Sequence, residues 1–203
     1  LDEPLSNLDK NLRVQMREEL KNLQRTLGLT TIFVPHDQEE AMTTADRMAV
    51  LDQGILQQVG SAAELYDYPQ NRFVAGFVGT ANLLDGQVTA VDAGGLDFEV
   101  HRLGALRLPP PAEPLASGAA TLALRPHQVS IAAPQDATDA SRLWLDGQVE
   151  SAEFLGEFSR YRVRVGELAL LSDQPHCAGV PLFAPGAPVR LGIDPRQLRL
   201  LTA

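Results

Sequence analysis

Cysteine is nearly absent from this sequence, since Cys177 is the only one in 203 residues. A single cysteine cannot form a disulfide within the chain, and such scarcity is typical of proteins from a reducing compartment. Aromatic residues are also scarce, at 5%, and 17 Lys and Arg residues stand against 26 Asp and Glu, which gives a formal net charge of −9. Binding to nucleic acid needs surplus positive charge, and single strands also need aromatic rings for base stacking. We therefore expect no nucleic-acid partner.

Long apolar runs are missing as well. No segment approaches the roughly 20 consecutive apolar residues of a membrane-spanning helix, and no basic stretch followed by an apolar one opens the sequence as a secretory leader would. Hydrophobic residues still make up 44% of the chain, which is enough for a packed core. These totals predict a soluble, cytoplasmic protein of one large or two small domains, which could dock on a membrane partner.

The composition changes near Gly79. Before this point, helical patterns alternate with short apolar strands. After it, short β runs are separated by Gly and Pro. The change predicts an α/β part at residues 1–79 and an all-β part at residues 80–203.

The first part opens with a predicted helix over residues 7–28, because Leu and Met recur there at spacings of three and four residues. Asp9 suits the start of this helix as a cap, and Gly28 suits its end. The β-branched run "TTIFV" at residues 30–34 predicts a buried strand. The other expected elements are a short helix at 36–46, strands at 47–52 and 54–60, a capping box of Ser61 and Glu64, and an amphipathic segment at 71–79.

The second part contains a weak internal repeat. Its matching positions are "GQV" at Gly86 and Gly147, and a proline with a glutamine two residues later at Pro126 and Pro195. Each copy is too short to bury much apolar area alone, so we expect two small β units of like design packed together. Chance similarity between such short strings is the alternative. Residues 109–114 and 134–141 have the composition of loops.

Two adjacent carboxylates, Asp2 and Glu3, follow what would be a strand, and α/β sheets place their sites at the carboxyl ends of strands. Because side chains alternate along a strand, the two would point in different directions. One could then hold a metal ion while the other orients or deprotonates a water, as phosphoryl transfer requires. An ordinary acidic turn is the alternative.

His36 directly follows the run "TTIFVP". If the strand before His36 runs parallel to the one that ends in Asp2 and Glu3, all three side chains converge on one edge of the sheet. A histidine there could hydrogen-bond a phosphate oxygen and help to place an attacking water. A lone histidine also fits a purely structural role.

These residues belong to a longer pattern. "LDEPLSNLD", "TTIFVPHDQEEA" and "ADRMAVLDQGILQQVGSAAELYDYPQNRFVAGFVG" follow one another within the first 80 or so positions. In order, spacing and intervening residues, the chain resembles the C-terminal half of an ABC-transporter ATPase, most closely the importer ATPases of the maltose, polyamine and ferric-iron type. The resemblance implies that residues 1–79 are an α/β remnant of a P-loop NTPase.

The resemblance also implies roles for individual residues. Asp2 corresponds to the Walker B aspartate that organises Mg²⁺, Glu3 to the catalytic glutamate that polarises the hydrolytic water, and His36 to the switch histidine that contacts the γ-phosphate. The D-loop, which crosses to the partner subunit, corresponds to Ser6, Asn7 and Asp9. The full-length protein is thereby expected to use ATP and Mg²⁺ and to form a homodimer. It would bind transmembrane permease subunits at the inner face of the cell membrane, and meet a solute-binding protein only indirectly.

The β part extends the resemblance. "LALRPHQVSI", "VESAEFLGE" and "VRLGIDPRQLRLL" look like the transport-associated OB-type (TOBE) domain appended to that subgroup. Such domains form small barrels, contribute to dimer contacts and in some relatives carry regulation or bind a small anion. The resemblance therefore implies an all-β domain of two OB-like small barrels over residues 80–203.

The chain departs from the family pattern in two ways. Pro35 stands where relatives most often carry Thr or Ser, and proline lacks a backbone N–H and fixes φ next to His36. No G-x-x-x-x-G-K-[ST] stretch for binding phosphates, and no signature loop of the Leu-Ser-Gly-Gly-Gln kind, occurs in the sequence. We therefore expect a truncation or remnant of a longer ATPase, which alone neither hydrolyses ATP nor binds it tightly.

A binding module is the competing hypothesis. The β part would then sense a small anion or regulate, and the α/β part would be a non-catalytic scaffold. The candidate anion contacts are Arg125, His127, Arg160, Arg162 and Arg164. Alternate arginines in "RYRVRVG" are more typical of the solvated face of a strand, because charged side chains are mostly exposed.

Overall fold

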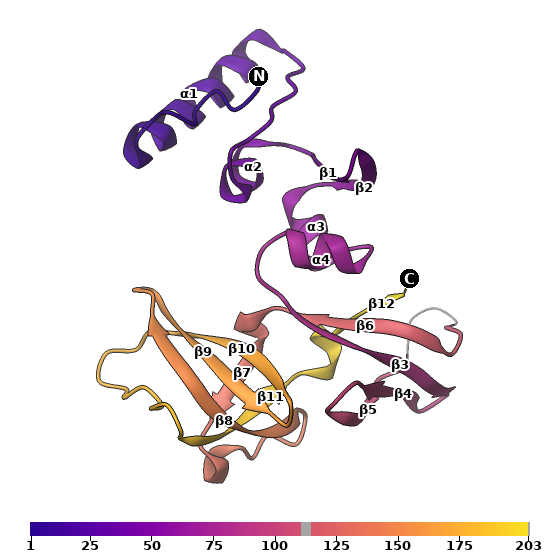
Figure 1. The fold of residues 1–203 in the computed structure, drawn as a ribbon. Helices are drawn as coiled ribbons and strands as arrows, with labels where there is room; N and C mark the ends of the chain where they lie inside the picture. The colour runs from indigo at the N-terminus through magenta and orange to yellow at the C-terminus, as the bar shows by residue number, and fades with distance from the viewer. Residues whose placement is uncertain (111–114, 203) are drawn as a thin grey trace. The chain divides into compact units, whose positions relative to one another are not determined.

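The computed structural model describes residues 1–110 and 115–202, in two compact units: unit 1 is Leu1–Gly79 and unit 2 is Thr80–Ala203 (Figure 1). Each unit has its own hydrophobic core. Residues 111–114 of the loop expected at 109–114 lie outside the described residues. Over the described ranges, no helix combines the length and the apolar composition that crossing a bilayer requires.

Unit 1 is mostly helical and contains one small hairpin. Its elements in chain order are α1 (Lys10–Leu27), α2 (Gln38–Thr44), β1 (Met48–Asp52), β2 (Ile55–Gly60), α3 (Ala62–Asp67) and α4 (Arg72–Phe77). As predicted, Asp9 caps the start of α1, since its carboxylate accepts the backbone N–H groups of Asn11 and Leu12 at 3.0 Å each. The helix ends at Gly28, whose φ of 62° is a left-handed conformation that glycine adopts without strain.

The second half of unit 1 also follows the sequence pattern. β1 and β2 are joined through Gln53 and Gly54, whose φ values of 48° and 80° fit a tight two-residue hairpin turn. α3 starts with the predicted capping box, in which Ser61 and Glu64 each accept the backbone N–H of the other. The buried members of the small core between these elements are Val50, Leu65, Val74 and Val78.

The prediction of a buried strand at residues 30–34 is wrong. This segment forms a single parallel bridge, between Val34 and Asp2, and Ile32 is 82% exposed. Only the short segment 1–3 pairs with it among the described residues, so no sheet forms to bury its β-branched side chains. No residue of α1 is buried either. The described part of unit 1 therefore does not form the parallel sheet that an α/β NTPase contains.

The described residues of unit 2 form two five-stranded antiparallel sheets (Figure 1). The first sheet has the order β12-β6-β3-β4-β5 and the second has the order β7-β11-β8-β9-β10. The strands are β3 (Asn82–Asp92), β4 (Gly95–Val100), β5 (Gly104–Leu108), β6 (Gly118–Leu124), β7 (Val129–Ala132), β8 (Leu143–Phe154), β9 (Phe158–Val165), β10 (Leu168–Pro175), β11 (Pro188–Ile193) and β12 (Arg199–Thr202). The 3-10 helices are η1 (Pro126–Gln128), η2 (Pro134–Asp136) and η3 (Pro195–Gln197).

The two sheets are built alike, which confirms the predicted repeat. Strands β3 to β6 correspond in order to β8 to β11, and each set is followed by a 3-10 helix that starts at the repeated proline, Pro126 or Pro195. After that helix the chain crosses to the other sheet, so that β7 pairs with β11 and β12 pairs with β6. Each OB-like unit is therefore completed by the last strand of the other, an exchange that the sequence did not predict.

The repeated glycine has the same role in both sheets. A Cβ on Gly86 would lie 2.6 Å, and one on Gly147 2.7 Å, from a side-chain carbon of the neighbouring strand. In both strands the pairing register shifts soon afterwards, beyond Val88 and beyond Val149, as it does at a β-bulge. The "GQV" repeat thus marks the point where each long strand passes close to its neighbour and bends.

Side chains cover the free edge of β10. Asn82 is 5% exposed, its Nδ2 donates to the Leu171 carbonyl at 2.8 Å, and its Oδ1 accepts the Leu171 N–H at 2.7 Å. Ser172 Oγ and Gln174 Nε2 both donate to the Val129 carbonyl, at 2.6 Å and 2.8 Å. These bonds occupy an edge that would otherwise expose unpaired backbone groups, and they tie it to the start of β7 at the opposite edge of the same sheet.

We expect Gly86→Ala and Gly147→Ala each to lower the free energy of unfolding by about 1–3 kcal/mol, because the added Cβ overpacks the contact with the adjacent strand. Urea unfolding followed by circular dichroism measures the change. Gly94→Ala is the matched control, since its Cβ would meet only exposed side-chain atoms at 3.3 Å and 3.4 Å, and its effect should stay within about 0.5 kcal/mol. A midpoint unchanged by both test substitutions would contradict the close-approach argument.

We expect Asn82→Ala to destabilise unit 2 by about 1–3 kcal/mol, because it leaves the N–H and carbonyl of Leu171 without their partners. Amide hydrogen exchange should accelerate most at Leu171. Thr89→Ala serves as the control, since it removes an exposed hydroxyl bonded to a single carbonyl, that of Asp97. Equal exchange at Leu171 in the wild type and the Asn82 variant would show that the amide does not hold the edge.

Candidate functional site

Hydrogen bonds of the main chain join the two segments that carry the predicted carboxylates and histidine. Two backbone hydrogen bonds join residues 1–3 to residues 32–34, from Glu3 N to the Val34 carbonyl at 2.8 Å and from Val34 N to the Leu1 carbonyl at 2.9 Å. The terminal amino group of Leu1 donates a third bond, to the Ile32 carbonyl at 2.9 Å. The alternating donors and acceptors have the parallel pattern, but the two segments form only one bridge, between Asp2 and Val34, and not two strands of a sheet. Glu3 and its neighbouring carboxylate therefore lie at the edge toward which the other segment continues to His36.

A tight turn follows the two carboxylates. Glu3 has a φ of 39°, a positive value that residues other than glycine rarely adopt. Its carbonyl accepts both the backbone N–H of Ser6, at 3.3 Å, and the Ser6 hydroxyl, at 3.0 Å. Leu5 is only 4% exposed and anchors the turn. Uncommon backbone conformations of this kind are often found at functional sites.

His36 is positioned by Glu40, a residue that the sequence analysis did not single out. Glu40 is 1% exposed, and its Oε2 accepts the backbone N–H of His36 at 3.0 Å. Asp37 in turn accepts the backbone N–H of Glu40 at 2.7 Å and so caps α2. The contacts are reciprocal, like those of a capping box displaced by one residue. The only clue in the sequence was an acid four positions after the histidine.

The remaining predicted residues lie in the turn or at the start of α1. The side chains of Asp2, Glu3, Asn7 and His36 are exposed. Ser6 is half-buried, and its hydroxyl is engaged within the turn. The carboxylate of Asp9 is engaged as the cap of α1. The structure thus brings together the segments that carry the candidate metal ligand, base and histidine, and it gives Asp9 a structural contact.

The carboxylates of Asp2 and Glu3 are oxygen donors of the kind that Mg²⁺ takes. Among residues 1–110 and 115–202, no group of three or more His, Cys, Asp and Glu side chains is arranged to hold a metal ion. Mg²⁺ commonly takes only one or two carboxylates and completes its coordination with waters and substrate phosphates. An exposed carboxylate at Asp2, next to a second one at Glu3, meets that requirement.

Three of the candidate anion contacts in unit 2 are engaged with other side chains. Arg160, Arg162 and Arg164 alternate with buried residues along β9. Arg160 donates two hydrogen bonds of 2.8 Å to Asp173, and these raise the pKa of the Arg160 guanidinium above its usual value. Arg162 and Arg164 each donate to a side chain of β8, at 3.1 Å and 2.7 Å. This arrangement is that of a solvated strand face.

The other two candidates lie near η1. Arg125 is 5% exposed, and its guanidinium donates to the Thr80 carbonyl at 3.3 Å. Its backbone N–H donates to Gln128 Oε1 at 2.9 Å, which fixes the start of η1. His127 is exposed within η1. Arg125 therefore has a structural role at the join between β6 and β7.

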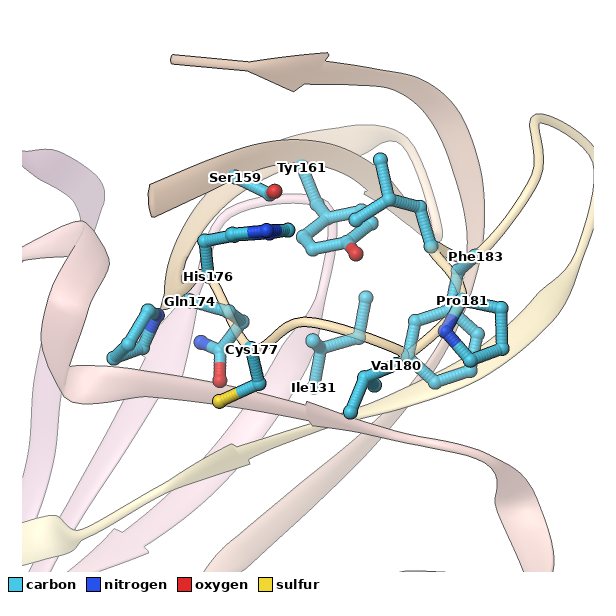
Figure 2. Close-up of a pocket in the computed structure, with 11 residues that line it drawn as sticks. Ile131, Ser159, Tyr161, Gln174, His176, Cys177, Val180, Pro181 and Phe183 are labelled. Carbon is cyan, nitrogen blue, oxygen red and sulfur yellow. The ribbon is translucent and has the colours of Figure 1, made fainter. Parts of the chain in front are cut away.

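A cavity of about 310 Å³ opens at the end of the second sheet (Figure 2). Ser159 and Tyr161 line it from β9, where they continue the row of buried residues that faces the core. Other lining residues, from β7, the end of β10 and the segment after it, include Ile131, Gln174, His176, Val180, Leu182 and Phe183. Sequence analysis missed this site, because isolated hydroxyls in a strand form no motif.

Comparison with known proteins agrees with the β architecture. Residues 122–201 match the family model of the TOBE domain. Among solved structures, a cytoplasmic molybdate-binding protein, ModG, superposes with a TM-score of 0.52 and 18% identity, over 60% of this chain and 96% of that one. An identity this low supports a shared fold and nothing more.

Curated relatives extend the comparison to nearly the whole chain. The spermidine/putrescine import ATP-binding protein PotA of Rubrobacter xylanophilus is 38% identical over 206 residues, which is 99% of this chain and 52% of that protein. The same protein of Pseudomonas fluorescens is 43% identical over 167 residues, 82% of this chain and 44% of the relative. The maltose/maltodextrin import ATP-binding protein MalK of Salmonella typhimurium is 40% identical over 205 residues, 98% of this chain and 53% of the relative.

This chain spans about half the length of the curated relatives that it matches. The identity covers unit 1 as well as unit 2, because it extends over 98–99% of the chain in two of the three comparisons. The predicted resemblance is thereby confirmed: the chain contains a TOBE domain and is related to the ATP-binding subunits of ABC importers of the polyamine and maltose type.

Proposed function

We propose that this chain is a C-terminal portion of the ATP-hydrolysing subunit of an ABC importer. The observation that carries the proposal is the parallel pairing of residues 1–3 with residues 32–34, which brings Asp2, Glu3 and the segment of His36 to one edge. The relatedness to importer ATP-binding proteins supports the same assignment. In this proposal unit 1 is a remnant of a P-loop NTPase domain, and unit 2 is its regulatory and dimerisation domain.

Each residue at the edge has a distinct task in this proposal. Asp2 would hold Mg²⁺, which when bound neutralises charge on the nucleotide phosphates. Glu3 orients the attacking water and accepts its proton. His36 donates a hydrogen bond to an oxygen of the terminal phosphate, and Glu40 holds the backbone of His36 in place. Catalysis of this kind consists mainly of positioning and of stabilising charge.

The turn after Glu3 suits contact with a second subunit. Asn7 is exposed at its tip, and Ser6 and Asp9 fix the flanking backbone through their hydrogen bonds. In the full subunit this turn would reach across a homodimer, and the dimer would bind transmembrane permease subunits on the cytoplasmic face of the membrane. The pairing of Arg160, Arg162 and Arg164 with neighbouring side chains favours this proposal over an anion-sensing module.

We expect the 203-residue chain alone to show no ATP hydrolysis, because its sequence has no phosphate-binding G-x-x-x-x-G-K-[ST] segment. Fusion to the part of the Rubrobacter xylanophilus relative that this chain does not match should restore activity. In that fusion, Glu3→Gln and His36→Ala should each lower kcat by about 10²–10⁴-fold, while the KM for ATP changes little. Phosphate release measures the rate.

Glu167→Gln, an equally conservative change at an exposed turn of unit 2, is the control and should keep the parent rate. An active fusion in which Glu3→Gln keeps its full kcat would exclude the proposed role of Glu3. ATP turnover by the unfused chain would show that this chain binds the phosphates without a G-x-x-x-x-G-K-[ST] segment.

We expect Glu40→Ala to increase the hydrogen-exchange rate of the His36 amide about tenfold or more, because it removes a hydrogen bond to a buried carboxylate. Glu40→Gln keeps an acceptor oxygen and should retain most of the protection. Glu39→Ala, at the exposed neighbouring position, is the control. The measurement uses the chain as it is, by NMR. Equal protection of the His36 amide in the wild type and in Glu40→Ala would show that Glu40 does not hold the backbone of His36.

A further inference from the structure

The cavity in unit 2 lies at the end of the second sheet, whose inward side chains belong to the hydrophobic core of that unit. Along β9, Ser159 and Tyr161 line the cavity, while the next two inward positions, Val163 and Val165, belong to the hydrophobic core. The rings of Tyr161 and Phe183 are in contact, with centroids 6.0 Å apart, so β9 is joined here to the segment after β10. Mouths of β-barrels are frequent sites of ligand binding, because the fold holds inward side chains there at fixed positions.

Ser159 is a buried polar group without a hydrogen-bond partner. It is 2% exposed, and its Oγ makes no hydrogen bond to the described part of the chain. A buried hydroxyl left unpaired costs about 1–3 kcal/mol, and native proteins retain few of them. Figure 2 shows Ser159 and Tyr161 among the lining residues, with the Tyr161 hydroxyl pointing in among them. Both hydroxyl-bearing residues lie on one face of β9, and Ser159 Oγ has no partner among the described residues.

Among the described residues that line the cavity, none carries a carboxylate, ammonium or guanidinium group. The lining consists of hydroxyl, amide, imidazole, thiol and apolar side chains. The closest charges along the same strands, those of Arg160 and Asp173, alternate to the opposite face and neutralise each other through two bonds of 2.8 Å. The described lining offers an ion no permanently charged partner, so the cavity favours an uncharged occupant.

We propose that this cavity binds a small, uncharged molecule about the size of a single ring, with one hydroxyl or carbonyl group that hydrogen-bonds to Ser159. A volume of about 310 Å³ is at the lower end for ligand pockets, which sets the size of the ligand. Ile131, Val180 and Phe183 cover its apolar part. This binding site goes beyond the proposed importer function and does not depend on it.

The test titrates the ¹⁵N-labelled full chain with phenol, and with benzoate as a charged ligand of similar shape. We expect saturable NMR shifts for phenol, centred on Ser159, Tyr161 and Phe183, with a dissociation constant of about 1 mM, and at least tenfold weaker binding of benzoate. Ser159→Ala should weaken phenol binding about three- to tenfold, because it removes the hydrogen bond. It should not lower the stability of the fold, since the lost hydroxyl has no partner to leave unpaired.

Ser141→Ala is the matched control, because it removes an exposed hydroxyl bonded within its own loop, and phenol binding should not change. Any of three results would overturn the proposal: no saturable shift with phenol, shifts centred outside the cavity, or equal affinity for benzoate. Unchanged phenol affinity in a folded Ser159→Ala variant would equally remove Ser159 from the site. None of these results bears on ATP hydrolysis, so the two proposals fail separately.

Discussion

The functional interpretation depends on three hydrogen bonds between residues 1–3 and 32–34, since these join the segment of the two carboxylates to the segment that leads to His36. Two paired segments are only marginally stable without further strands or a covered face. In unit 1 the exposure of Ile32 and the absence of buried residues in α1 leave that cover incomplete. The residues that would do chemistry are therefore held by the least supported part of the molecule, and the buried side chains of Leu5 and Glu40 are their main internal anchors.

Unit 2 meets the need for further strands and a covered sheet face by exchanging strands between its two copies. Each of its copies gives its last strand to the other, so β7 and β12 complete sheets that neither copy could complete alone. Twenty buried hydrophobic residues form one shared cluster among its described residues, against four in the cluster of unit 1. Because every sheet contains strands from both copies, loss of one copy would open both sheets. We therefore expect unit 2 to unfold as a single unit and to keep its structure when unit 1 opens locally.

The features predicted from sequence are those that local chemistry determines. The cap at Asp9, the end of α1 at Gly28, the hairpin turn and the capping box all depend on residues close in the chain. The repeat was visible in the sequence because both copies have glycine where two strands approach closely and proline at the start of the 3-10 helix. The strand exchange, the partners of the arginines on β9 and the role of Glu40 depend on contacts that no periodicity encodes. The strand at residues 30–34 was predicted wrongly because β propensity assumes neighbours on both sides.

The two candidate sites share one feature, a buried polar atom that lacks a hydrogen-bond partner within the described residues. Glu40 Oε1, on the carboxylate that holds the His36 backbone, and Ser159 Oγ, on a residue that lines the cavity of unit 2, are among the buried polar atoms without a hydrogen bond within the described residues. A fold gains nothing in stability from burying such atoms, because each loses its hydration without replacement. The presence of such a buried atom is explained if a bound molecule supplies the missing hydrogen-bond partner. For Ser159 the proposed partner is a small uncharged ligand.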